Sequence, residues 1–322
     1  MFILIIFLCS LFIWLLYETK WLSIRLPSGR LPRRKPNTMA RSAVLQPQRN
    51  QVMGAITSLV DITATAGMRA AIVYLLAIIA AEVTTVIIQP FLGVMCHIIV
   101  LLVVLARSAL TSDHRLRQLV LSLALIPLVR IMSLSMPLTN VPLIWSFPII
   151  YAPLLGAGLM VIRILGYSMG DVGLRLNFRS LRFQLTVALT GFLFGVMEYL
   201  ILAAAPMMAR EFTLQEVWLP AFIFLVCTGF VEEFIFRGVL QRTAVEAFGG
   251  WRGIVYISLL FAILHLIHYT ANPPISYYDI PFVFIVAMFF GWVVKKTGSL
   301  FGVTLAHAIT NILLYLIFPF LF

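Results

Sequence analysis

The sequence predicts an all-α membrane protein, a polytopic transmembrane helix bundle of about ten spans (eight to ten). Two observations predict this fold class. The 322 residues are 62% hydrophobic and only 11% charged, and apolar runs of membrane-spanning length recur along most of the chain. Because every backbone polar group in lipid needs an internal partner, continuous apolar runs of this length indicate helices.

The first predicted span is an N-terminal anchor that a basic linker follows. The apolar run over residues 1–17 lacks a basic region and a small-residue cleavage site, so we expect a retained anchor rather than a cleaved signal peptide. Residues 18–50 are rich in Lys, Arg and Pro, which is typical of a cytoplasmic linker that can touch anionic lipid headgroups. The later apolar runs predict spans over 70–89, 91–108, 117–135, 142–165, 183–206, 218–241, 251–269, 280–294 and 300–318. Pro90 leaves open whether 70–108 forms two spans or a re-entrant hairpin.

The charge pattern predicts the orientation of the bundle. The formal net charge is +11 at pH 7, which on a soluble protein would suggest a nucleic-acid partner. Here most basic residues lie in short connections, and basic connections alternate with connections that carry only Arg210, as the positive-inside rule describes. We therefore expect no nucleic-acid partner, but a multi-pass integral protein of the cell (plasma) membrane with cytoplasmic basic loops and both termini outside.

The cysteines predict no covalent or metal framework. The three residues, Cys9, Cys96 and Cys227, all fall within apolar runs and have no paired spacing. Neither a disulfide framework nor a cysteine-based metal site is indicated. We expect them to be small packing residues.

Four ionisable residues lie singly in the predicted spans of the first part of the chain: Glu82, His97, Arg130 and Glu198. Ionisable groups inside a membrane are costly and rare, so each one raises a functional question. Because each stands singly, we expect an isolated hydrogen bond between helices, or a position near a helix end, for each of them.

The stretch VEEFIFRGVL, residues 231–240, places two acids and a base in one apolar run. Glu233 and Arg237 are four residues apart, so they can pair on one helix face. Glu232 lies about 100° around the helix, away from that partner. A buried carboxylate without a counter-charge has a raised pKa, which suits a general base near neutrality. The spacing therefore predicts a structural role for Glu233 and a chemical role for Glu232.

Two later runs bring imidazoles into the membrane. Phe261 and His265 are four residues apart, as are His307 and Asn311, so each pair shares one helix face. Glu232 and His307 both lie roughly 12–14 Å from their cytoplasmic helix ends, whereas His265 is nearer 20 Å, which requires a deeper start or a tilt of its helix. We expect one polar site in or near the cytoplasmic half of the membrane, reached by water through a polar cavity.

These residues form a known pattern. EEFIFR matches EExxxR, FAILH matches FxxxH and HAITN matches HxxxN, in that order and on successive apolar runs. The sequence resembles the CAAX-protease and bacteriocin-processing (CPBP, also ABI) family of intramembrane endopeptidases over roughly residues 215–315. The expected organisation is an anchor and linker over 1–50, helices of unassigned role over 51–214, and a C-terminal catalytic helix core over 215–318.

The resemblance implies hydrolysis of a peptide bond by a water that glutamate activates. The implied catalytic residues are Glu232, Glu233, His265, His307 and Asn311. The implied orienting residues are Arg237 and Phe261. Glu232 would activate the water with help from His265, whereas His307 and Asn311 would stabilise the oxyanion.

Other readings stay open beside this one. No cofactor is expected, but in a metal-dependent version Glu232, His265 and His307 could bind zinc with water as the fourth ligand. A transporter, or a scaffold that keeps the fold without catalysis, would also use buried acids and histidines. The expected partner is a peptide or membrane-protein substrate. The sequence reveals neither whether this substrate is prenylated nor the oligomeric state.

Overall fold

The computed structural model describes residues 67–136, 141–175, 177–202, 207–266 and 278–321. All regular secondary structure in these ranges is helical, as the composition predicts. The expected anchor over 1–17 and the basic linker over 18–50 lie outside the described residues.

The described part of the chain contains eight helices long and apolar enough to cross a membrane. They are Gly67–Ile88, α3 (Pro90–Leu110), α4–α5 (His114–Ser135), α6 (Leu143–Leu165), η3–α7 (Phe178–Leu202), α8–α9 (Leu214–Phe248), α11 (Asp279–Thr297) and α12–α13 (Phe301–Leu321). This confirms the polytopic helical bundle. Gly67–Ile88 and α3 each have spanning length of their own, which favours two spans over a re-entrant hairpin at Pro90.

One predicted span is shorter than expected. The run over 251–269 forms α10, Gly250–Leu264, which has only 15 residues. At 1.5 Å per residue it covers about 22 Å, against a hydrocarbon core of about 30 Å. The helix ends where His265 becomes its C-cap, so the described part of this run is shorter than a span, and residues 267–269 of the prediction lie outside the described residues.

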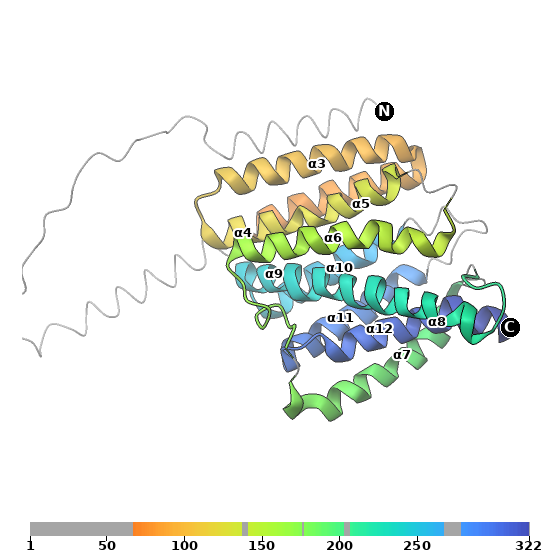
Figure 1. The fold of residues 1–322 in the computed structure, drawn as a ribbon. Coiled ribbons are helices and arrows are strands. Elements are labelled where there is room, and N and C mark those ends of the chain that lie inside the picture. Colours follow the sequence, from red (N-terminus) through yellow and green to blue (C-terminus); the bar gives the residue numbers. More distant parts are fainter. Residues whose placement is uncertain (1–66, 137–140, 176, 203–206, 267–277, 322) are drawn as a thin grey trace, which may run out of the picture.

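The helices lie in layers around a main hydrophobic core. In Figure 1, α3, α5 and α6 lie side by side, α10–α12 lie beyond them, and α7 lies on the far side against α12. Buried apolar side chains from the N-terminal and C-terminal helices belong to a single cluster. The helices that carry the three motifs are thus enclosed between α6 and α7.

The basic connections gather at one end of the bundle. Gln118 Nε2 donates to the Leu165 carbonyl oxygen at 3.4 Å, and the Asn177 amide donates to the Thr297 carbonyl oxygen at 3.0 Å. The Lys295 ammonium lies 5.1 Å from the centre of the Trp251 ring. Connections that are far apart in sequence therefore lie together at one end of the bundle. This is the arrangement expected when successive helices run in opposite directions and every second connection is basic.

Glycines bring α7 close to α12. An added Cβ at Gly191 would lie 2.4 Å from the Ala306 carbonyl oxygen, and one at Gly195 would lie 3.0 Å from Leu313. The Thr310 hydroxyl donates to the Gly191 carbonyl oxygen at 3.2 Å across this contact. Small residues at such positions let two helices approach in a membrane.

Gly191→Ala is expected to destabilise the protein by about 1–3 kcal/mol, because the new methyl group overpacks the α7–α12 contact. Thermal unfolding in a mild detergent measures this change. Gly156→Ala is the matched control, since an added Cβ there meets nothing within 4 Å. Equal melting temperatures for the two variants would contradict the close packing of α7 on α12.

Candidate active site

The helix that carries the first motif is π-helical around the acids. η4 covers Phe224–Glu232 and η5 covers Phe234–Leu240, with Glu233 between them. π-Helical turns are rare and occur often at functional sites. The angle expected from a regular α-helix therefore does not apply, yet the two acids still differ in environment. The side chain of Glu232 is 15% exposed and that of Glu233 is 0% exposed.

Glu233 is held by two partners in the protein interior. Arg237 Nη1 donates to Glu233 Oε1 at 2.9 Å, and His307 Nδ1 lies 2.8 Å from the same oxygen. Because a carboxylate paired with an arginine only accepts hydrogen bonds, Nδ1 of His307 carries the proton. Glu233 thus joins the first motif to the third.

Phe261 supports this arrangement from α10. The Arg237 guanidinium lies 4.3 Å from the centre of the Phe261 ring, a cation–π contact. The same ring lies 4.8 Å from the ring of His265 and 6.2 Å from that of His307. Phe261 therefore packs among the ionic groups of all three motifs.

Glu232 has a neutral partner that the sequence did not reveal. The Tyr151 hydroxyl donates to its Oε1, and its Oε2 lies 3.9 Å from His307 Nε2. The expectation that Glu232 is kept away from an arginine agrees with these contacts, but the acid is not without a hydrogen bond. Tyr151 lies on α6, outside the segment that carries the motifs, and nothing in its local sequence signals this role.

His265 and Asn311 are held at the two other sides of the site. His265 Nδ1 lies 2.9 Å from the Phe261 carbonyl oxygen. The Asn311 amide donates to the Thr228 hydroxyl oxygen at 2.9 Å, and that hydroxyl donates to the Phe224 carbonyl oxygen at 2.8 Å. Thr228, one turn before the acids, is a second contact that the motifs did not predict.

These side chains line one cavity of about 300 Å³. Its wall is mainly apolar and aromatic, including Phe147, Phe194, Phe282 and Phe290. The polar residues in the wall are Arg130, Tyr151, Glu198, Thr228, Glu232, Arg237, His265, His307, Thr310, Asn311 and Tyr315. A mainly apolar cavity with convergent polar groups is the usual form of a ligand site. Glu232, His265, His307 and Asn311 all face it, whereas Glu233 lies behind them.

The N-terminal ionisable residues are not isolated. Arg130 Nε and Nη2 donate to the two oxygens of Glu82 at 2.6 and 2.8 Å, and His97 Nε2 lies 3.2 Å from Glu82 Oε1. Arg130 and Glu198 also line the cavity. The expectation of isolated contacts is therefore wrong for Glu82, His97 and Arg130, because Gly67–Ile88, α3 and α5 pack with these three side chains facing one another.

The geometry also bears on the zinc alternative. Among the residues that the structure describes, no group of three or more His, Cys, Asp or Glu side chains is arranged to hold a metal ion. The set Glu232, His265 and His307 shares the cavity without forming such a group.

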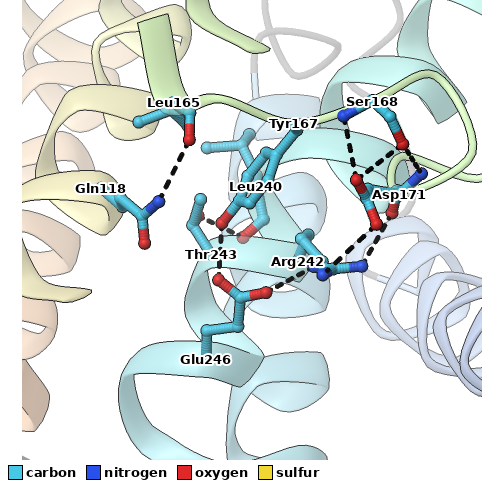
Figure 2. Close-up of polar contacts among 9 residues, drawn as sticks. All are labelled: Gln118, Leu165, Tyr167, Ser168, Asp171, Leu240, Arg242, Thr243 and Glu246. Carbon is cyan, nitrogen blue, oxygen red and sulfur yellow. Dashed lines mark hydrogen bonds and ion pairs between the residues drawn. The ribbon is translucent and has the colours of Figure 1, made fainter. Parts of the chain in front are cut away.

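The connection between α6 and α7 anchors the helix that carries the acids (Figure 2). Arg242 donates to Glu246 at 2.5 Å and to the Asp171 carbonyl oxygen at 3.0 Å, and the Tyr167 hydroxyl donates to Glu246 at 2.6 Å. Ser168 donates to the Asp171 carboxylate through its hydroxyl and its backbone N–H. These hydrogen bonds keep the pKa of Asp171 below its ordinary value, so it is ionised beside Arg242 at neutral pH.

The same connection contacts the turn before α12. The Leu300 N–H donates to the Gly173 carbonyl oxygen at 3.0 Å, and Gly173 has a φ of +78°, a conformation that favours glycine. An added Cβ at Gly238 would lie only 2.8 Å from the Val172 carbonyl oxygen, so the connection lies directly on η5. It thereby fixes the Glu232 helix and the His307 helix relative to one another.

Comparison with known proteins finds a match in the C-terminal part of the chain. Residues 214–313 match the family model described as "Type II CAAX prenyl endopeptidase Rce1-like". The match contains all three motifs and the two π-helical segments. No curated protein and no solved structure matches the chain.

Proposed function

We propose that the protein, whose residues 214–313 match the Rce1-like family of type II CAAX prenyl endopeptidases, is a hydrolase that cleaves membrane-associated or lipidated peptides with a water activated by Glu232. One observation carries this proposal. Of the two adjacent acids, only Glu232 faces the cavity, where it lies beside His307, and no arginine within the described ranges is bonded to it. Glu233 is buried, and its carboxylate is already paired with Arg237 and His307.

The proposed reaction begins at Glu232. Its carboxylate takes a proton from water, with help from His265, and the hydroxide attacks the carbonyl carbon of the scissile bond. The peptide C–N bond then breaks, and the protonated Glu232 returns the proton to the leaving amine. The products are a carboxylate and an amine, and the enzyme is unchanged.

His307 and Asn311 are proposed to stabilise the oxyanion. In this role the imidazole carries a proton on each nitrogen, so that Nδ1–H donates to Glu233 while Nε2–H faces the cavity. The buried Glu233 compensates the imidazolium charge. The Asn311 amide is oriented by Thr228. Such preorganised donors act strongly where bulk water is excluded.

Asn311→Ala is expected to lower kcat by about 10²–10³-fold, the usual effect of losing one oxyanion donor. Asn311→Asp should lose more, because it places a negative charge beside the oxyanion. Both rates are measured on a fluorogenic S-farnesyl CAAX peptide with the purified protein in liposomes. A kcat for Asn311→Ala within about threefold of wild type would contradict the oxyanion role.

The substrate is sought by proteomics of membrane-protein termini, comparing cells with wild type and cells with Glu232→Gln. We expect a set of C termini that depends on Glu232. An identical set in both cells would contradict proteolysis.

Two other results would support the alternatives. Loss of the activity of the purified wild-type protein on chelation, with recovery on adding zinc, would support the metal-dependent version. Proton-coupled flux in liposomes that survives Glu232→Gln would support a transporter.

The orientation is proposed from the charge pattern. The end of the bundle that gathers the basic connections is assigned to the cytoplasm of a cell membrane. A cysteine introduced at exposed Arg179 should react with an impermeant maleimide only after the cells are opened. Labelling in intact cells would reverse the assignment.

A further inference from the structure

The end of α10 needs a partner from outside the helix. The last four carbonyl oxygens of a helix receive no hydrogen bond from within the helix, so they need partners from elsewhere. α10 ends at Leu264, and the backbone N–H of His265 donates to the Ala262 and Ile263 carbonyl oxygens, while its Nδ1 lies 2.9 Å from the Phe261 carbonyl oxygen. Arg130 Nη2 donates to the Leu264 carbonyl oxygen. A cation at this end also interacts favourably with the helix dipole.

The arginine is itself firmly held. Its Nε and Nη2 form a fork on the two Glu82 oxygens, and His97 lies against the same carboxylate. Glu82 and His97 are 0% exposed, and Arg130 is 8% exposed. The three residues come from Gly67–Ile88, α3 and α5. The end of α10 is thus bonded to a unit built from three N-terminal helices.

The bonded carbonyl directly precedes His265. The backbone of His265 forms the C-cap of α10, and its ring nitrogen lies 2.9 Å from the Phe261 carbonyl oxygen. The ring therefore moves with the end of the helix. We propose that Arg130, fixed by Glu82, is a positioning residue that sets His265 in the cavity for its work with Glu232. This inference rests on the proposed function, and it assigns a role to the helices outside the family match.

The contacts favour positioning over two simpler roles. Glu82 alone satisfies the charge of Arg130, so the bond to Leu264 adds a link to another helix rather than a charge partner. A role in binding a substrate carboxylate is disfavoured because the charge of Arg130 is paired with Glu82, and three of its five N–H groups already donate to Glu82 and Leu264. Displacement by about 1 Å at a catalytic group is enough to cost about 10²-fold in rate.

The test uses variants of the full-length protein in nanodiscs. Arg130→Met alone leaves Glu82 buried without a partner and can unfold the protein, so the main variant is the double change Glu82→Gln with Arg130→Met. Arg130→Lys keeps the charge and a donor but loses the fork. Arg179→Met, at an exposed arginine in η3 (Phe178–Ser180), is the matched control.

Two measurements decide the outcome. Hydrogen exchange of the peptide covering residues 258–266 reports whether α10 is held, with no need for activity. Kinetics on the S-farnesyl peptide separate kcat from KM. We expect the double variant to fold, to exchange about tenfold faster at this segment, and to lose about 10–100-fold in kcat with KM unchanged. Arg130→Lys should recover part of the protection from exchange and part of the kcat. Arg179→Met should exchange and react at the wild-type rates.

The contrary results are distinct. If hydrogen exchange at residues 258–266 is unchanged in the folded double variant, Arg130 does not stabilise the end of α10. If exchange is faster but kcat stays at the wild-type value, Arg130 does not position His265 for catalysis. An equal fall in kcat and rise in KM, with a melting temperature lowered to the assay temperature, would assign Arg130 to folding alone and also overturn the proposal. Full activity of Glu232→Gln would instead refute the proposed function, while the exchange measurement still decides whether Arg130 holds α10.

Discussion

Replacing Glu232 with glutamine is expected to lower kcat by about 10³-fold while the bundle stays folded. A positioned general base contributes about 10²–10⁴-fold, and an amide cannot take the proton from water. The shape is nearly the same, and the amide oxygen can still accept from the Tyr151 hydroxyl. Single-turnover rates on the S-farnesyl peptide, together with melting temperature, measure the two effects separately.

Glu216→Gln is the control for this substitution. Glu216 lies in the first turn of α8 (Leu214–Ile223) and is exposed, so its loss should leave both rate and melting temperature unchanged. A Glu232→Gln protein that retains a tenth or more of the wild-type rate would show that another group activates the water.

The second large effect concerns the buried pair behind Glu232. Arg237→Met is expected to destabilise the protein by about 3–5 kcal/mol, because it leaves Glu233 buried without its cation. The side chains of both residues are almost completely inaccessible, at 2% and 0% exposure. Denaturation in mixed micelles measures the loss.

The double variant Glu233→Gln with Arg237→Met separates stability from activity. Removing both charges together is often neutral for a buried pair, so we expect most of the stability to return. Activity should stay low, because the glutamine oxygen can still accept from His307 Nδ1 but no longer supplies the negative charge that compensates the imidazolium. Recovery of full activity in the double variant would show that the pair serves only folding.

Much of the fold could be predicted because the signals are local. The length of an apolar run determines whether a helix can span a membrane, and eight of the runs fold as spanning helices. The contact between Glu233 and Arg237 follows from their spacing within one helix. The order of the three motifs along the chain likewise indicates the family that residues 214–313 match.

The contacts that the sequence missed all join distant segments. Tyr151 reaches Glu232 from α6, and Arg130 reaches Leu264 from α5. Neither residue stands in a local pattern, so only the packing of the helices reveals it. The early end of α10 was missed for the same reason, since its last carbonyl is satisfied by a side chain from another helix.

The π-helical turns form another part that spacing could not predict. An angle of about 100° per residue assumes a regular α-helix, but η4 and η5 interrupt that geometry on both sides of Glu233. The predicted difference between the acids agrees with their exposures because packing against Arg237 and His307 buries Glu233. The outcome depends on these tertiary contacts rather than on helix periodicity.

The most direct test of water activation by Glu232 is a single turnover in H₂¹⁸O, with enzyme in excess over the S-farnesyl peptide. If Glu232 activates water, the new carboxylate of the product carries one ¹⁸O atom from the first turnover, and Glu232→Gln forms almost no product. An unlabelled product carboxylate would show that an enzyme carboxylate, and not water, attacks the peptide bond. That result would contradict the proposed mechanism.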